Sequence, residues 1–197
     1  MNKHVLGVVL AASVVAAPLY AKWTLMPATA RVSVANSAMT VVPGQGWNMT
    51  SVRPSKKGET WSFDGPILDQ VEFVGGVANG EPLAKERDKK RQPLPKFGSA
   101  MLAPDVAQAY EQTQRILTGS PDFAIDSMEP ASFAGHPGFR FAYHFTKPDE
   151  ELTRKGEARG AIVGGKLYMI SYTAAALHYF DAHLAKAQAI MDSAKLN

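Results

Sequence analysis

Two runs of β-prone residues separated by Gly164-Gly165 constrain the fold of this chain more than any other feature. The runs cover residues 154–163 and 166–173, and the glycine pair between them fits the two-residue loop of a tight β-hairpin. A two-residue loop fixes the strand register, because it places Val163 opposite Lys166. We therefore expect an antiparallel hairpin in which Arg159 lies opposite Ile170.

This register divides the hairpin into two faces, because side chains alternate along a strand. One face carries mostly small or apolar residues: Gly156, Ala158, Gly160, Ile162, Leu167, Met169, Ser171 and Thr173. The other carries Glu157, Arg159, Ala161, Tyr168, Ile170 and Tyr172. We expect the C-terminal helix to pack on the first face, where small residues would let its alanines approach closely.

The second face predicts a binding surface made of Arg159, Tyr168, Tyr172 and Glu157. Arginine and tyrosine are frequent anchors of protein interfaces. Tyr168 and Tyr172 are diagonal neighbours of Arg159 across the hairpin, within reach of its guanidinium group. The alternative interpretation is an ordinary ladder of cross-strand contacts, partly covered by the first helix.

Further strands and two helices complete the predicted fold. Strands are expected within residues 31–42, 59–63, 67–74, 123–128 and 139–145, with Gly75-Gly76 ending the third of these. Helices are expected over 104–118 and 177–195. The inward stripe of the second helix is Leu177, Phe180, Leu184, Ala187, Met191 and Ala194, which leaves His183 outside it. This order predicts a single α+β domain over residues 31–197, preceded by a lead-in segment at 22–30. Its core would be a twisted antiparallel sheet of six to eight strands built from hairpins, packed by one mid-chain and one C-terminal helix.

Residues 1–21 have the composition of a secretory signal. A basic start is followed by thirteen apolar residues from Val5 to Ala17, and Ala21 offers a small residue for cleavage before Lys22. Two alternatives are an uncleaved membrane anchor over 5–21 and a buried helix of the domain. The chain has no cysteine, so it is not a lipoprotein acylated after its signal. We expect a location in the periplasm or outside the cell, or an anchor in the inner membrane facing the periplasm.

Charge and residue content exclude several functions. The chain has 21 Lys and Arg against 18 Asp and Glu, and loss of Lys3 with the signal leaves 20 against 18. This balance argues against a nucleic-acid partner, which normally needs a strongly basic face. Without cysteine there is no disulfide, thiol nucleophile or cysteine-bound metal.

No motif predicts a catalytic centre, cofactor or metal site. The glycine-rich segment at 75–80 lacks the lysine and hydroxyl residue of a phosphate-binding loop, and reads as a turn. His178 and His183 lie five residues apart, which does not place them on one helix face as a metal pair. We therefore expect neither cofactor nor metal.

The run KGEARGAIVGGKLYMISY, followed by a terminal helix, resembles the PsbP/DcrB-like group of exported α/β proteins. The resemblance implies an antiparallel sheet between helices and a non-catalytic role in an envelope or as an accessory subunit. It lies in the order of elements, so it assigns no functional residue. The predicted function is a non-catalytic periplasmic or envelope binding or accessory protein, whose partner is a protein or small ligand. The alternatives are a small secreted hydrolase and an envelope protein tethered by its uncleaved N-terminal helix, the only case that predicts membrane contact.

Overall fold

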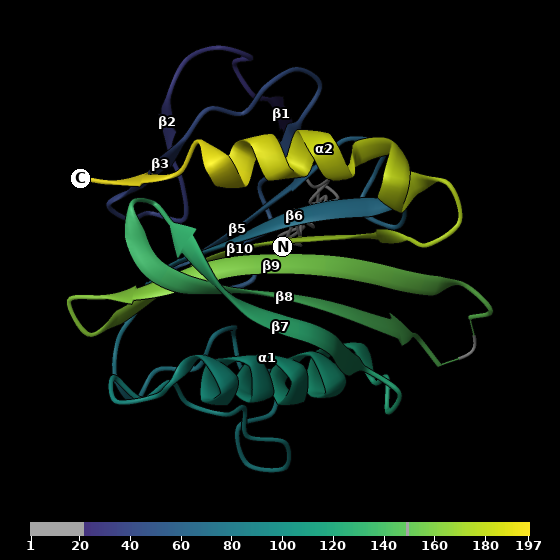
Figure 1. Ribbon diagram of the computed structural model, residues 1–197. Helices are drawn as coiled ribbons and strands as arrows, with labels where there is room; N and C mark the ends of the chain where they lie inside the picture. The colour runs from purple at the N-terminus through teal and green to yellow at the C-terminus, as the bar shows by residue number, and fades with distance from the viewer. Residues whose placement is uncertain (1–21, 149) are drawn as a thin grey trace, which may run out of the picture.

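The computed structural model describes residues 22–148 and 150–197 as three layers, with an antiparallel sheet between two helices (Figure 1). The strands of the large sheet lie in the order β1 (Trp23–Leu25), β4 (Asn48–Thr50), β5 (Gly58–Ser62), β6 (Asp69–Val77), β10 (Lys166–Ala175), β9 (Thr153–Val163), β8 (His136–Thr146) and β7 (Ala124–Phe133). Helix α1 (Ala103–Thr118) covers one face, and α2 (Tyr179–Asp192) covers the other. The predicted α+β class, with eight strands and two helices, is confirmed.

A second, three-stranded sheet lies beside the end of α2. It is formed by β11 (Lys195–Leu196), β3 (Met39–Val41) and β2 (Val32–Ser33). The predicted lead-in segment contains β1, which pairs with β4 at the edge of the large sheet. The proposed signal at residues 1–21, with its cleavage site, lies outside the described residues. Within the described part of the chain, no helix is both long and apolar enough to cross a membrane.

The central hairpin has the predicted register. Val163 pairs with Lys166 and Arg159 pairs with Ile170. In β8, Phe139, Phe141 and Tyr143 are buried on the α1 side, as the alternation predicts. The expected end of the third strand at Gly75-Gly76 is wrong, because β6 continues to Val77 and passes Gly76 with a shift of register against β10.

The structure reverses the predicted pairing of helices with faces. Helix α1, with Val106 and Tyr110, covers the face of Ala158 and Met169. The small residues of β9 make room for aromatic rings of β8, since Tyr143 lies over Gly156 and a Cβ there would be 2.0 Å from its ring. Helix α2 instead covers the opposite face.

The inward stripe of α2 agrees with the prediction at Ala187, Met191 and Ala194, which are buried, and at Phe180 and Leu184, which pack against the same core, but it differs at Leu177 and His183. Ala187, Ile190 and Met191 are buried against β6 and β10. Leu177 precedes the helix and is 81% exposed, whereas His183 is buried and Leu184 is half-buried. His183 joins the buried side of the helix because it finds a hydrogen-bond partner in the turn between β5 and β6.

Candidate ligand-binding cleft

A cleft of about 1070 Å³ opens over the part of the sheet that α1 leaves uncovered. Its floor is formed by β5, β6 and the end of β10. The C-terminal half of α1 makes one wall, through Tyr110, Gln114 and Leu117. Loop residues 52–54 and 84–87 make the opposite wall, and the backbone N–H of Lys85 donates to the carbonyl of Pro54, 2.8 Å away, joining these two loops.

The floor of the cleft is polar, although it belongs to the central sheet. Thr60 on β5 pairs with Glu72 on β6, and Gln70 pairs with Thr173 on β10. Paired residues of neighbouring strands point to the same face, and all four of these line the cleft. A sheet face packed only against protein would carry apolar side chains here, as the adjoining part under α1 does.

The hydroxyl groups of Tyr110, Tyr143 and Thr173 extend this polar surface beneath α1. The hydroxyl of Tyr110 donates to that of Tyr143 over 3.1 Å, and Tyr143 Oη lies 2.6 Å from Thr173 Oγ1. Burial raises the pKa of Tyr110 well above its ordinary value and raises the pKa of Tyr143 to about 12. Both phenols are therefore neutral at physiological pH and can exchange hydrogen bonds with one another and with a neighbour.

Glu72 has no hydrogen bond or ion pair with any described residue, although it is partly buried. Burial raises the pKa of its carboxyl group above the ordinary value. Glu59, on the neighbouring strand, points to the opposite face and has its carboxylate satisfied. It accepts from Trp61 Nε1 at 2.8 Å and from the backbone N–H of Ala35 at 3.1 Å, and lies 3.4 Å from Arg53. Glu72 thus presents free hydrogen-bonding capacity to the cleft.

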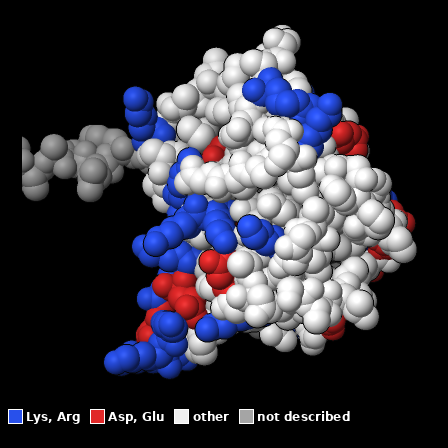
Figure 2. Space-filling view, turned by 90° about the vertical axis from the view of Figure 1, so that its left-hand side faces the viewer, with Lys and Arg blue, Asp and Glu red and all other residues white. Residues whose placement is uncertain are grey.

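The rim of the cleft is basic. Five of its lining residues are Arg53, Lys85, Arg87, Lys147 and Arg154, against the three acids Asp69, Glu72 and Glu86. In Figure 2, basic side chains gather along the left edge of the molecule, interspersed with acidic ones, while most of the remaining visible surface is uncharged. Trp23, at the start of β1, also lines the cleft and is 41% exposed.

The four residues of the predicted binding surface lie together, but not on an open face. Tyr172 is fully buried, Tyr168 and Glu157 are nearly so, and the side chain of Arg159 is 14% exposed. Arg159 donates to Glu157 at 2.8 Å and to Asp192 of α2 at 2.6 Å. The expectation of an exposed surface is wrong, because α2 packs over it. The structure instead matches the alternative interpretation, a ladder of cross-strand contacts covered by a helix, except that the covering helix is α2 and not α1.

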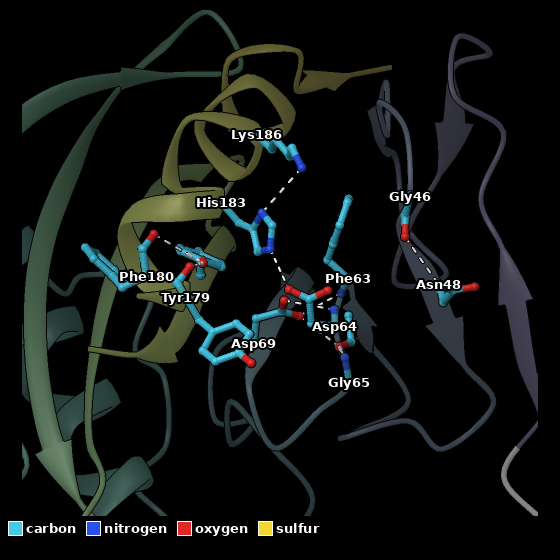
Figure 3. Close-up of polar contacts among 12 residues, drawn as sticks. Gly46, Asn48, Phe63, Asp64, Gly65, Asp69, Tyr179, Phe180, His183 and Lys186 are labelled. Carbon is cyan, nitrogen blue, oxygen red and sulfur yellow. Dashed lines mark hydrogen bonds and ion pairs between the residues drawn. The ribbon is translucent and has the colours of Figure 1, made fainter. Parts of the chain in front are cut away.

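A second polar cluster joins α2 to the turn between β5 and β6 (Figure 3). His183 Nε2 lies 2.6 Å from Asp64 Oδ2, and the ring of His183 packs against Phe63 in a tilted arrangement with 4.4 Å between centroids. Lys186 Nζ lies 3.4 Å from His183 Nδ1 and 3.8 Å from the centroid of Phe63. The cluster holds the first turns of α2 onto the sheet. The sequence analysis missed it because Asp64 and His183 are 119 residues apart.

Asp64, Asp69 and His183 also have the spacing of a metal site, since their ligand atoms lie within 4.8 Å of one another. The oxygens of Asp69 are already used, however. They accept from the hydroxyl of Ser62 and from the backbone N–H groups of Phe63 and Asp64. The ammonium of Lys186 beside His183 would also repel a cation. We assign this cluster a structural role.

No known family model matches this sequence, and no match to a curated protein is found. The fold is similar to the solution structure of cyanobacterial PsbP from Synechocystis, with 14% identity, 92% of this chain and 100% of that chain covered, and a TM-score of 0.56. It is also similar to the Ran-binding protein Mog1p of Saccharomyces cerevisiae, with 9% identity, 88% and 96% coverage, and a TM-score of 0.50. The predicted resemblance to PsbP is confirmed at the level of the fold, which is all that such identities show.

Proposed function

We propose that this chain is an exported, non-catalytic binding protein of the periplasm or cell envelope, and that it holds its ligand in the cleft beside α1. The observation that carries this proposal is the polar floor at Thr60, Glu72 and Thr173. Polar groups placed on the face of a central sheet are costly when they lack partners. Thr173 already shares a hydrogen bond with Tyr143, and a bound molecule that replaces water on this floor would supply partners for Glu72 and Thr60.

The chemistry of the cleft favours binding over hydrolysis. Its lining residues include no histidine, and a hydroxyl nucleophile needs a base within hydrogen-bond reach. Among the described histidines, His144 pairs with Asp126 at 2.6 Å and His183 with Asp64, and neither is a lining residue of the cleft. The secreted hydrolase is therefore the weaker alternative.

The composition of residues 1–21 supports export, and the fold is compatible with a binding role. Mog1p, which shares the fold, is described as a Ran-binding protein. A protein partner rather than a small ligand is the second form that a binding role could take here, as an accessory subunit of an envelope complex.

Native mass spectrometry of protein purified from its own host tests the proposal. We expect a small-molecule adduct that is lost on denaturation. Gln70→Trp would fill the cleft floor and should abolish the adduct, whereas Gln92→Trp, the same change in an exposed loop outside the cleft, should retain it. The absence of any adduct on the wild-type protein would contradict the proposal. A co-purifying protein retained by both variants would favour the accessory role.

A further inference from the structure

The floor and the rim of the cleft differ in chemistry, and together they restrict the class of ligand. We propose that the cleft binds an acidic saccharide, whose hydroxyl groups lie on the floor at Glu72 and Thr173 and whose anionic group lies at the rim beside Lys85 and Arg87. This inference rests on the proposed binding function and names the ligand for the same site.

The floor offers paired donors and acceptors at short spacing, which suits a polyhydroxylated molecule. Thr60 and Glu72 are cross-strand neighbours, as are Gln70 and Thr173, and such neighbours have Cβ atoms about 5 Å apart. Neighbouring hydroxyl groups of a sugar ring can both donate to the free carboxyl group of Glu72 and accept from Thr60 or Gln70. Ordered hydroxyls at Tyr143 and Thr173 extend the same surface.

A purely apolar ligand fits this floor poorly. An alkyl chain laid over this floor would leave the side chains of Glu72 and Thr60 without a partner, whereas Thr173 keeps its hydrogen bond to Tyr143. Every such group costs about 1–3 kcal/mol when it is buried unsatisfied. The cleft also has apolar lining residues, among them Trp23, Leu117 and Phe145. There an amphipathic ring with one apolar and one wet side can cover a face of the ligand.

The rim selects for a negative charge. Lys85 and Arg87 are exposed, line the cleft, and form no ion pair with a described carboxylate. Arg53 and Lys147 also line the cleft, each beside a carboxylate, Glu59 at 3.4 Å and Glu150 at 4.0 Å respectively. A cationic ligand would have to pass this rim to reach Glu72, so an amine is disfavoured despite the free carboxyl group.

Isothermal titration calorimetry with defined probes tests the ligand class. The acidic probe is a tetrasaccharide of galacturonic acid, and the neutral probe of equal length is maltotetraose. Inorganic phosphate and citrate report on simple anion binding. We expect the acidic tetrasaccharide to bind about tenfold or more tightly than maltotetraose and than either anion, with an affinity that falls as salt is raised.

Two variants separate floor from rim. Lys85→Ala combined with Arg87→Ala should weaken the acidic tetrasaccharide about tenfold and leave maltotetraose unchanged. Glu72→Leu should weaken both saccharides and leave the melting temperature no lower than that of the wild type, because it removes an unpaired carboxyl group. The control, Lys89→Ala combined with Lys90→Ala, removes the same charge in the same loop but outside the cleft, and should bind as the wild type does.

Equal affinity for the acidic and neutral saccharides would overturn the role of the rim. Equal affinity for citrate or phosphate would reduce the site to an anion patch and overturn the saccharide class. If none of the probes binds while native mass spectrometry still finds a cleft-dependent adduct, the saccharide class falls and the binding function stands. If no probe binds and native mass spectrometry finds no adduct, both the saccharide class and the binding function are contradicted.

Discussion

Glu59 and Glu72 lie on neighbouring strands, point to opposite faces of one sheet, and differ in what surrounds them. Glu59 is held by three partners and is 3% exposed. Glu72 faces the cleft with its carboxyl group free and the pKa of that group raised by burial. The same substitution at the two positions should therefore have opposite effects on stability.

We expect Glu72→Gln to raise the melting temperature at pH 7 and Glu59→Gln to lower it. The neutral amide removes the cost of ionising a buried, unpaired carboxyl group at position 72. At position 59 one carboxylate oxygen becomes an NH2 group that faces the N–H donor of either Ala35 or Trp61, and Arg53 loses its ionic partner, at a cost of about 1–3 kcal/mol. Thermal melts of the two purified variants check this, and a destabilised Glu72→Gln would show that the carboxyl group has a partner.

The gain at position 72 should depend on pH. Because the pKa of Glu72 is raised in the folded state, the native protein holds the proton more tightly than the unfolded chain. Its contribution to stability is then greatest below the unfolded pKa and is lost as the pH rises through the folded value. The stabilisation by Glu72→Gln should therefore shrink toward zero at about pH 3.5. A gain of equal size at both pH values would exclude ionisation as its cause.

Substitution of His183 by aspartate should destabilise the protein far more than the same substitution on the outer side of α2. His183→Asp would place a carboxylate beside Asp64, now 2.6 Å from the imidazole. We expect it to lower the free energy of unfolding by about 2 kcal/mol or more. Ala185 is exposed and lies two residues after His183, so Ala185→Asp should lower the free energy of unfolding by no more than about 0.5 kcal/mol. Urea denaturation compares the two, and similar midpoints would mean that His183 is not held as described.

Elements differed in how far they could be predicted. The central hairpin was predictable in register because Gly164-Gly165 fixes the loop length and the loop length fixes the pairing. The sequence did not predict which helix covers which face of the hairpin. Both faces of β9 and β10 are largely buried, and neither shows the polar alternation of an exposed side. The predicted stripe of α2 held at Ala187, Met191 and Ala194 but left out His183, since a histidine counts as polar in a periodicity argument until its partner is known.

The fit between β8 and β9 should be intolerant of any side chain at Gly156. A Cβ at this position would lie 2.0 Å from Cζ of Tyr143, whose hydroxyl is fixed by Tyr110 and Thr173. We expect Gly156→Ala to lower the free energy of unfolding by about 1–3 kcal/mol, the range of overpacked cores. In Gly98→Ala the added methyl meets only Met101 at an ordinary 3.6 Å, so this control should melt close to the wild type. Equal melting temperatures would show that Tyr143 moves aside freely.

At the scale of the whole molecule, the two helices cover the sheet unequally, and this produces the cleft. Helix α1 packs over β8 and the adjoining strands, so that the α1 side of β5 and β6 is left to loops and solvent. Thr60, Glu72 and Thr173 were each visible as polar positions in β-prone runs. Their assembly into one floor required strand order β5-β6-β10, which joins segments about a hundred residues apart and has no local signal in the sequence.

Lys22, the residue that follows the predicted cleavage site, is part of the folded domain. The backbone N–H of Lys22 donates to Ser51 Oγ at 3.0 Å, and the N–H of Ser51 donates to the carbonyl of Lys22 at 3.0 Å. Lys22 therefore already belongs to the sheet edge that β1 continues. Cleavage between Ala21 and Lys22 would leave these two hydrogen bonds between Lys22 and Ser51 in place.

We expect protein from the native host to begin at Lys22. Ala21→Phe should block processing, because signal peptidase requires a small residue before the cut, while Lys22→Ala should be processed normally. Intact-mass spectrometry of the fractionated cell measures both. Wild-type protein that retains Met1 in the membrane fraction would establish the tethered alternative, with the cleft facing the periplasm. Wild-type protein that retains Met1 in the soluble cytoplasm would contradict export, and an acidic saccharide of the envelope could then no longer reach the cleft.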